Sequence, residues 1–289
     1  MLNNYGRLLR KIHFHPLFWI VACFAIITGY YWELLTLFLI VFIHEMGHAT
    51  CAHFFSWKIN RILIMPFGGI CEVDEHGNRP VIEELLVVLA GPFQHIWMAA
   101  TVFILGTNEV ISMEFATMFQ QFNIMVFLFN LLPVWPLDGG KVIYLYLSSR
   151  QPFLTAFKQS LLCSFIVLTF LLCLFLIVFP FNLNVWIVLV YLYASLWHQW
   201  NQMRFSFMRF LLERYSGKQT GFKKLDVIEV EGSEYVSSIM EQFRRGCKHV
   251  IHVDDGKRML GKLDENEMLH AFFAEKQIRA RLKDIVYHD

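Results

Sequence analysis

Residues 34–55 read LLTLFLIVFIHEMGHATCAHFF, an apolar run interrupted by His44, Glu45 and His48. A stretch of about 20 apolar residues predicts a helix that crosses a membrane. A charged side chain near the centre of a bilayer costs about 2.5 to 3.5 kcal/mol on insertion scales, so Glu45 is expected there only if something compensates its charge. A bound cation is the obvious candidate.

The interruption is an HExxH pattern. On a helix with 3.6 residues per turn, two histidines four apart project from one face, where their imidazoles can bind a single tetrahedral Zn²⁺. Glu45 then lies where it can act as general base on a metal-bound water. The motif therefore predicts a hydrolytic zinc site within a membrane helix.

The composition divides the chain into two parts. Hydrophobic residues make up 56% of the chain and charged residues 17%, and 15 of the 25 Lys and Arg follow Arg204. This predicts a membrane part with a smaller soluble tail. A net charge of +1 gives no electrostatic basis for binding nucleic acid, so no direct nucleic-acid partner is expected.

Six stretches are apolar enough to cross a bilayer. They are 16–32, 34–55, 82–105, 115–132, 161–179 and 185–205. Every Lys and Arg before the tail falls in connections that this order puts on one side, which the positive-inside rule makes cytoplasmic. We expect an all-α six-helix bundle in the cell membrane with both termini cytoplasmic. The expected divisions are 1–205 for the membrane domain, 206–222 for a linker and 223–289 for the tail.

The end of the fourth span offers a third ligand. The segment 130–140 reads NLLPVWPLDGG, and Asp138 is expected at a depth similar to that of the HExxH motif. Its prolines interrupt the helix, and its glycines permit close backbone approach. A catalytic zinc usually takes three protein ligands. Asp138 as a plain helix N-cap in an ordinary connection is the alternative.

HExxH in one span and N-x-x-P-x-x-P-L-D-G in a later one resemble the signatures of the site-2 protease family of intramembrane zinc metalloproteases. The resemblance implies one zinc per chain, with roles for five residues: His44, His48 and Asp138 as ligands, Glu45 as catalytic base and Asn130 as a holder of the substrate peptide or its oxyanion. The family's G-P-x-x-N pattern reads GPFQH at 91–95 and lacks the Asn. His95 is either a partner of a metal ligand or an ordinary hydrogen-bonded membrane histidine.

A substrate helix must unwind before it is cut, because its peptide groups are paired within the helix. Residues 58–73 are rich in β-forming residues on both sides of Pro66-Phe67-Gly68-Gly69, which predicts a hairpin or reentrant loop beside the site. An exposed edge of it could hold the unwound substrate as an added strand. A hairpin that merely packs on the cytoplasmic surface is the alternative.

The tail alternates between strand and helix patterns. Strands are expected at 227–230, 250–253 and 259–263, helices at 235–245 and 265–273, and a turn at 254–257. The pattern is similar to a single CBS domain, a resemblance that implies pairing into a homo-oligomer and binding of ATP or another adenosine nucleotide. Asp264, Glu265 and Glu267 would repel phosphate. A dimerisation or substrate-docking module is the equal alternative.

The predicted function is intramembrane proteolysis, in which a zinc-bound water activated by Glu45 attacks a peptide bond. The resemblance further implies a membrane-associated sporulation sigma-factor precursor as substrate, inhibitory membrane proteins as partners, and the outer forespore membrane as location. One alternative is a membrane metal-ion transporter using His44, His48 and Asp138 as a transit site. Another is a CBS-regulated binding protein without activity. A compact cluster with an open position, and the presence of Glu45, favour hydrolysis.

Overall fold

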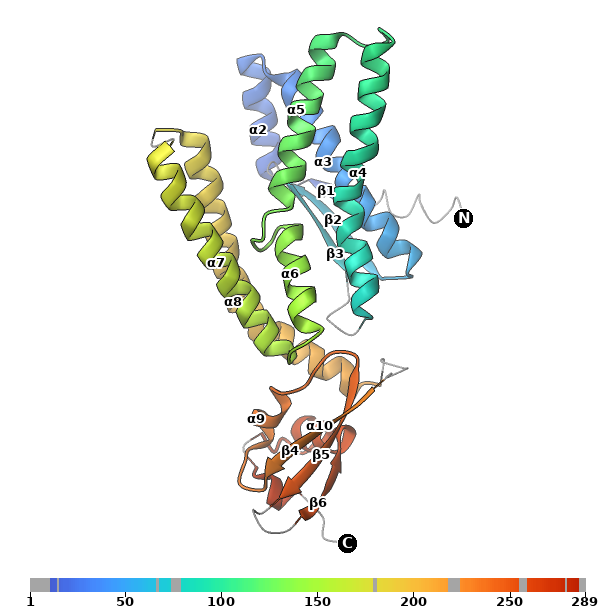
Figure 1. Ribbon diagram of the computed structural model, residues 1–289, viewed down its shortest axis with the longest axis vertical. Helices are drawn as coiled ribbons and strands as arrows, with labels where there is room; N and C mark the ends of the chain where they lie inside the picture. The colour runs from blue at the N-terminus through green and yellow to red at the C-terminus, as the bar shows by residue number, and fades with distance from the viewer. Residues whose placement is uncertain are drawn as a thin grey trace. The chain divides into compact units, whose positions relative to one another are not determined.

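The computed structural model describes residues 11–285 except 15, 66–67, 74–78, 179–180, 218–223, 255–258 and 279. The chain forms two compact units, shown as a ribbon in Figure 1. The N-terminal unit comprises residues 1–75 and 82–142, and the C-terminal unit comprises residues 76–81 and 143–289. Each unit has its own sheet.

Apolar helices dominate the N-terminal unit. They are α2 (Pro16–Thr28), α3 (Tyr31–Phe54), α4 (Val81–Thr107), α5 (Met113–Asn130) and the start of α6 (Asp138–Ser148). Helix α2 ends at Thr28, before the end of the predicted span 16–32, because Gly29 adopts a φ of +83° that breaks the helix. Glycine accepts this φ readily because it has no Cβ atom. Buried apolar side chains from α3, α4 and α5, among them Ile40, Met98 and Phe119, form the core that positions the site.

A three-stranded sheet completes the N-terminal unit. Its strands are β1 (Ile12–Phe14), β2 (Ile59–Met65) and β3 (Gly68–Val73), in the order β1-β2-β3. Strands β2 and β3 are antiparallel, as the hairpin prediction required, while its tip at Pro66 and Phe67 lies outside the described residues. Strand β1 pairs in parallel with the other side of β2, which was not predicted. Among the described strands, β3 therefore keeps one edge unpaired.

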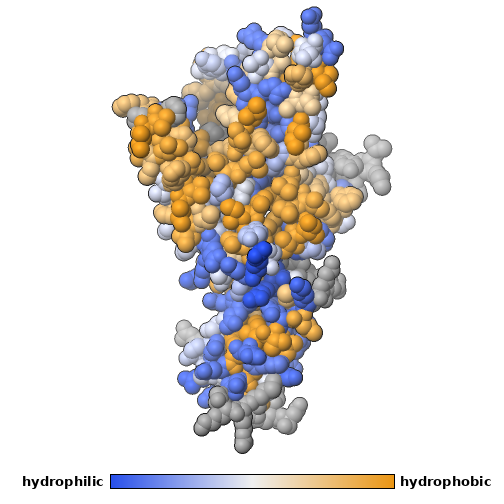
Figure 2. Space-filling model, viewed as in Figure 1, coloured by the Kyte–Doolittle hydropathy of each residue, from blue (hydrophilic) through white to orange (hydrophobic). Residues whose placement is uncertain are grey.

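Three of the described helices, α3, α4 and α7 (Phe153–Val178), are long and apolar enough to cross a membrane. Over the face seen in Figure 2, hydrophobic side chains cover most of the helical part, whereas hydrophilic side chains are prominent around the C-terminal sheet. An apolar surface on several long helices is typical of a multi-pass membrane protein.

The C-terminal unit contains α7 and α8 (Leu183–Tyr215), and α8 extends into the range 206–222 that was predicted as a linker. Residues 206–215 are helical, although their charges suggested a linker. The physical reason is an apolar stripe between those charges: Phe210 and Leu211 are buried, and the Phe210 ring stacks on Phe153 with centroids 4.4 Å apart. Burial of this stripe keeps α8 continuous as far as Tyr215.

The tail has the predicted alternation of strands and helices. Its elements are β4 (Lys224–Glu231), α9 (Val236–Met240), β5 (Cys247–Asp254), β6 (Met259–Asp264), α10 (Glu265–Phe273) and the 3₁₀ turn Leu282–Asp284. Strand β5 lies in the middle, parallel to β4 and antiparallel to β6. The predicted helix 235–245 is wrong in length, since α9 ends at Met240. Helix α10 has the predicted limits, and Asp264 and Glu267 form its capping box.

Candidate metal centre

Helix α3 presents both histidines of the HExxH motif on one buried face, as their spacing predicts. The Nε2 atoms of His44 and His48 are 3.1 Å apart. Asp138, the first residue of α6, places its Oδ2 atom 3.1 Å from each of them. All three side chains are buried. The structure thus brings together the two segments that lie 90 residues apart in sequence.

This triangle of atoms fits a zinc ion. With bonds of about 2.0–2.2 Å, the ligand atoms of a tetrahedral zinc lie about 3.3 Å apart. The Nδ1 atom of His48 is 2.8 Å from the carbonyl oxygen of Val87, which can only accept, so Nδ1 carries a proton and, in the neutral ring, Nε2 has a lone pair. That lone pair faces the carboxylate oxygen of Asp138. Two buried acceptors in contact need either a proton on one of them or a cation between them, and two imidazole nitrogens with one carboxylate oxygen are a donor set that fits zinc.

The second carboxylate oxygen of Asp138 has its own partner. The Nζ atom of Lys141, one turn further along α6, lies 3.0 Å from Oδ1. This ion pair holds the carboxylate in one orientation and leaves Oδ2 turned toward the histidines. Lys141 was not singled out in the sequence, where only its i, i+3 spacing from Asp138 pointed to it.

Glu45 lies beside the triangle, buried, with a carboxylate oxygen within 4.8 Å of ligand atoms of both histidines. Two glycines leave room for these side chains. A Cβ atom on Gly69 of β3 would come within 2.3 Å of Glu45 Cγ, and one on Gly91 of α4 within 2.3 Å of His48 Nε2. Neither glycine was predicted to line the site, because only the packing of β3 and α4 against α3 reveals it.

Asn130 ends α5 and is half-buried. Its Nδ2 atom donates a hydrogen bond to the carbonyl oxygen of Val126 at 3.1 Å, within its own helix. In the described part of the chain no hydrogen bond joins Asn130 to His44, His48 or Asp138. Its role toward a substrate therefore stays a prediction.

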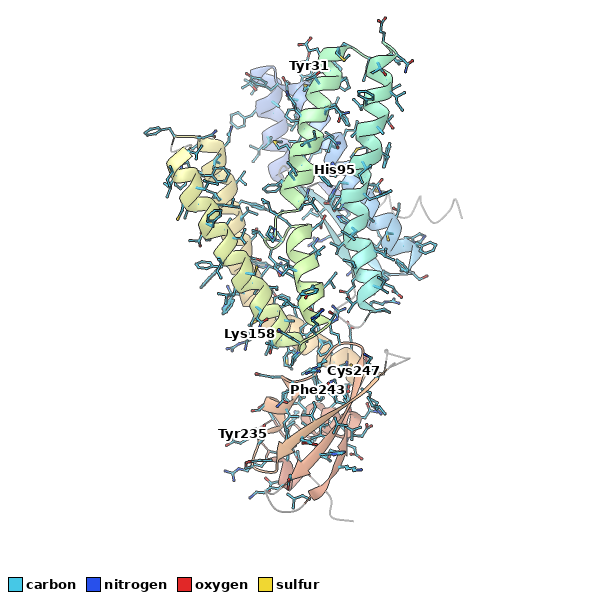
Figure 3. All side chains as sticks on the ribbon, viewed as in Figure 1. Tyr31, His95, Lys158, Tyr235, Phe243 and Cys247 are labelled. Atoms are coloured by element: carbon cyan, nitrogen blue, oxygen red, sulfur yellow. The ribbon has the colours of Figure 1, made fainter. Side chains whose placement is uncertain are left out.

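Two further buried polar residues stand behind His44. His95, labelled on α4 in Figure 3, places Nε2 3.0 Å from His44 Nδ1. Its Nδ1 atom is 2.7 Å from Oδ1 of Asn123 on α5. The sequence left His95 between two interpretations, and Asn123 carried no signal beyond being a polar residue in an apolar stretch. The structure joins both to the site.

Comparison with known proteins agrees with this geometry. Residues 32–114 and 107–174 match the description of peptidase family M50. Stage IV sporulation protein FB of Bacillus subtilis strain 168 is 42% identical over 285 residues, which cover 99% of each chain. This chain belongs to peptidase family M50. The resemblance inferred from HExxH and N-x-x-P-x-x-P-L-D-G is confirmed.

Other M50 relatives match over part of their length. Zinc metalloprotease MJ0392 of Methanocaldococcus jannaschii is 30% identical over 133 residues, or 44% of this chain and 38% of that protein. The solved structure of a site-2 protease from the same organism superposes with a TM-score of 0.53. The match covers 65% of this chain and 89% of that chain at 24% sequence identity, and it shows a shared fold. This M50 peptidase is an intramembrane zinc metalloprotease of the site-2 type.

Proposed function

We propose that this M50 peptidase cuts a membrane-associated protein at a centre where His44, His48 and Asp138 hold one zinc and Glu45 transfers the proton. The observation that carries the assignment is the triangle of three buried acceptor atoms 3.1 Å apart, with the Glu45 carboxylate beside it. When bound, zinc polarises the substrate carbonyl and lowers the pKa of a coordinated water.

The protein's own groups would do the rest. Glu45 takes a proton from the attacking water and returns it to the leaving amine, and its burial keeps bulk water from competing for that proton. Lys141 holds Asp138 in place through Oδ1. Asn130 is proposed to donate an amide N–H to the developing oxyanion, which requires it to release the carbonyl oxygen of Val126.

The sheet suggests how an unwound substrate is held. Strands β1 and β3 are the two edges of this sheet, and β3 is the edge that lies against the candidate site. Gly69 of β3 lies directly against Glu45. A substrate segment added as a strand at this edge would therefore bring its peptide groups next to the proposed base. This arrangement favours a substrate-binding hairpin over one that only packs on the surface.

For the topology we propose six spans, α2 to α5 together with α7 and α8, with both termini in the cytoplasm. The distribution of Lys and Arg supports this orientation, although Arg7 and Arg10 lie outside the described residues. The membrane domain then extends to Tyr215, where α8 ends, and a short connection leads to the tail at Lys224.

The substrate and partners are proposed from the relative. Similarity over the whole chain to Stage IV sporulation protein FB supports a sporulation sigma-factor precursor as substrate, inhibitory membrane partners and the outer forespore membrane. For the CBS-like tail we favour pairing with a second copy or substrate docking over nucleotide sensing. The reason is that the two residues considered for a phosphate are engaged elsewhere: Lys248 lies 2.9 Å from Asp264, and His249 donates to Glu265 at 2.9 Å.

Replacement of the proposed base tests this function. In full-length protein co-expressed with the sigma-factor precursor, Glu45→Gln should lower the rate of cleavage at least about 100-fold, because a general base contributes that much. Zinc content should stay at one per chain. Glu33→Gln, on the same helix α3, is the matched control and should cleave normally. Cleavage by Glu45→Gln would refute the mechanism. Zinc flux into proteoliposomes without any cleavage would favour the transporter.

A further inference from the structure

A chain of hydrogen bonds runs from α5 through α4 to the back of His44. It consists of Asn123, His95 and His44, all buried. We propose that His95, oriented by Asn123, is a positioning residue that holds His44 with its proton on Nδ1 and its lone pair on Nε2, and so prepares His44 to bind the metal. The proposal rests on the zinc centre described above and adds two residues to it.

The direction of the chain is set at its far end. The Nδ2 atom of Asn123 donates to the backbone carbonyl oxygen of His95 at 2.9 Å. A carbonyl oxygen can only accept, so the amide orientation is fixed and Oδ1 of Asn123 is the atom that lies 2.7 Å from His95 Nδ1. Because Oδ1 also only accepts, Nδ1 of His95 must carry a proton.

The tautomer of His95 then determines that of His44. With its proton on Nδ1, a neutral His95 has a lone pair on Nε2, which is 3.0 Å from Nδ1 of His44. His44 must donate there. In a neutral His44 the Nε2 atom is then left with a lone pair, at the corner of the triangle shared with His48 and Asp138. His48 reaches the same state through the carbonyl oxygen of Val87. Both histidines are therefore prepared by partners behind them.

The choice of an imidazole as the accepting partner has an electrostatic reason. Carboxylates often orient metal-bound histidines. Here the carboxylates of Glu45 and Asp138 are already buried at the site. A third carboxylate in an apolar segment would add another charge, and burying an unpaired ion costs on the order of several kcal/mol. A neutral His95 accepts the same hydrogen bond without adding charge.

The decisive experiment compares two replacements of His95 in purified full-length protein. His95→Phe keeps a ring but removes the acceptor, and it should lower zinc affinity about 10- to 100-fold, the usual cost of losing an outer-shell partner. His95→Gln offers an amide oxygen to His44 Nδ1 and should recover most of this affinity. Met98→Leu, at a buried position on α4 outside the chain of hydrogen bonds, is the control and should bind zinc like the wild type. Affinity is measured by competition with a chelating dye.

A spectroscopic measurement supplies a second readout. Nitrogen-15 NMR of the histidine-labelled zinc form should show His44 protonated at Nδ1 and metal-bound at Nε2. Wild-type affinity in His95→Phe, or a His44 bound through Nδ1, would overturn the proposal. If His95→Phe does not fold, Asn123 decides: Asn123→Gln keeps a neutral amide oxygen that can accept from His95 and should bind zinc more tightly than Asn123→Leu, and equal affinities would overturn the proposal.

The experiment also separates the two levels of inference. A wild-type protein that binds no zinc, or that binds it equally well with Asp138 replaced by Ala, would refute the zinc centre itself and this proposal with it. Zinc binding that depends on Asp138 but not on His95 would leave the proposed function standing and remove only the role of His95.

Discussion

The molecule contains two buried clusters built from similar residues, and they differ in how their polar atoms are paired. In the N-terminal unit His44, His48 and Asp138 turn acceptors toward one another. In the C-terminal unit Glu265 is equally buried, but every neighbour donates to it. Arg214 approaches through Nε at 2.5 Å and Nη2 at 2.8 Å.

The histidine of the second cluster is satisfied as well. His249 accepts from the backbone N–H of Arg244 at Nε2 and donates from Nδ1 to Glu265 at 2.9 Å. In this cluster these N–H donors all meet acceptors, whereas neutral histidines and the carboxylate of the triangle would face one another as acceptors unless a cation lay between them. Counting donors and acceptors thus distinguishes a structural cluster from a metal site when residue types alone do not.

Removal of a ligand should produce the largest effect and act on one cluster only. Asp138→Ala should lower zinc affinity by more than about 100-fold, because it removes one of three proposed ligands. Loss of a residue that only supports a ligand costs about 100-fold at most. The stability of the tail should not change. Zinc content and urea unfolding, followed at the buried Ile251 by methyl NMR, measure the two effects. One zinc per chain in Asp138→Ala would contradict the assignment.

Removal of Asn130 should affect cleavage and leave both clusters intact. Asn130→Ala should reduce kcat about 100-fold, at the lower end of what an oxyanion donor contributes, with zinc content unchanged. Gln121→Ala, an exposed position on the same helix α5, is the control. An unaltered kcat in Asn130→Ala would show that Asn130 does not donate to the oxyanion and serves only to bond the carbonyl oxygen of Val126.

The tail cluster predicts a pH effect on stability. Burial opposes ionisation of Glu265, but hydrogen bonds from His249 and Arg214 outweigh it and lower its pKa from 4.5 to about 2. A lowered folded-state pKa stabilises the fold above the unfolded pKa of 4.5, and this stability is lost as the pH falls toward 2.

The matching replacement is Glu265→Gln. It should cost the tail about 3 kcal/mol near pH 7, and the difference from wild type should shrink as the pH falls below 4.5. Urea titrations of the full chain at several pH values, read at Ile251, follow this difference. Glu229→Gln, an exposed acid on β4, serves as the control. A pH-independent difference would show that Glu265 is not ionised in the fold.

The smallest expected effect concerns space around the triangle. Gly91→Ala places a methyl group within 2.3 Å of His48 Nε2, and overpacking of this kind costs about 1 to 3 kcal/mol. Zinc affinity should fall about tenfold or somewhat more. Gly106→Ala on the same helix meets the Ala116 methyl at 3.1 Å and Met113 Sδ at 3.8 Å, both away from the triangle, and should bind zinc normally. Equal affinities in the two variants would mean that the ligands can move aside.

Much of the site was predictable because its parts follow from spacing along the chain. The i, i+4 spacing places His44 and His48 on one face, and matching depth within the spans pointed to Asp138. The partners of His44 were not predictable in the same way. His95 and Asn123 lie 51 and 79 residues beyond it, and only helix packing decides which polar atoms meet.

The fold shows the same division. Long apolar helices and the β2–β3 hairpin follow from local patterns, as do the limits of α10 with its capping box. Strand β1 escaped prediction because three residues carry no periodicity and its partner lies about 50 residues away. The extension of α8 to Tyr215 was not predicted, because the buried face of Phe210 and Leu211 was overlooked in a polar stretch.

The continuity of α8 has a mechanical consequence. Arg214 sits in the last turn of the same helix that begins at Leu183, so its angular phase is tied to that of every residue before it. Insertion of one residue upstream would turn the guanidinium by about 100° around the helix axis and withdraw it from Glu265. A rotation of α8 about its own axis would therefore turn Arg214 relative to Glu265 and exert a torque on the C-terminal sheet.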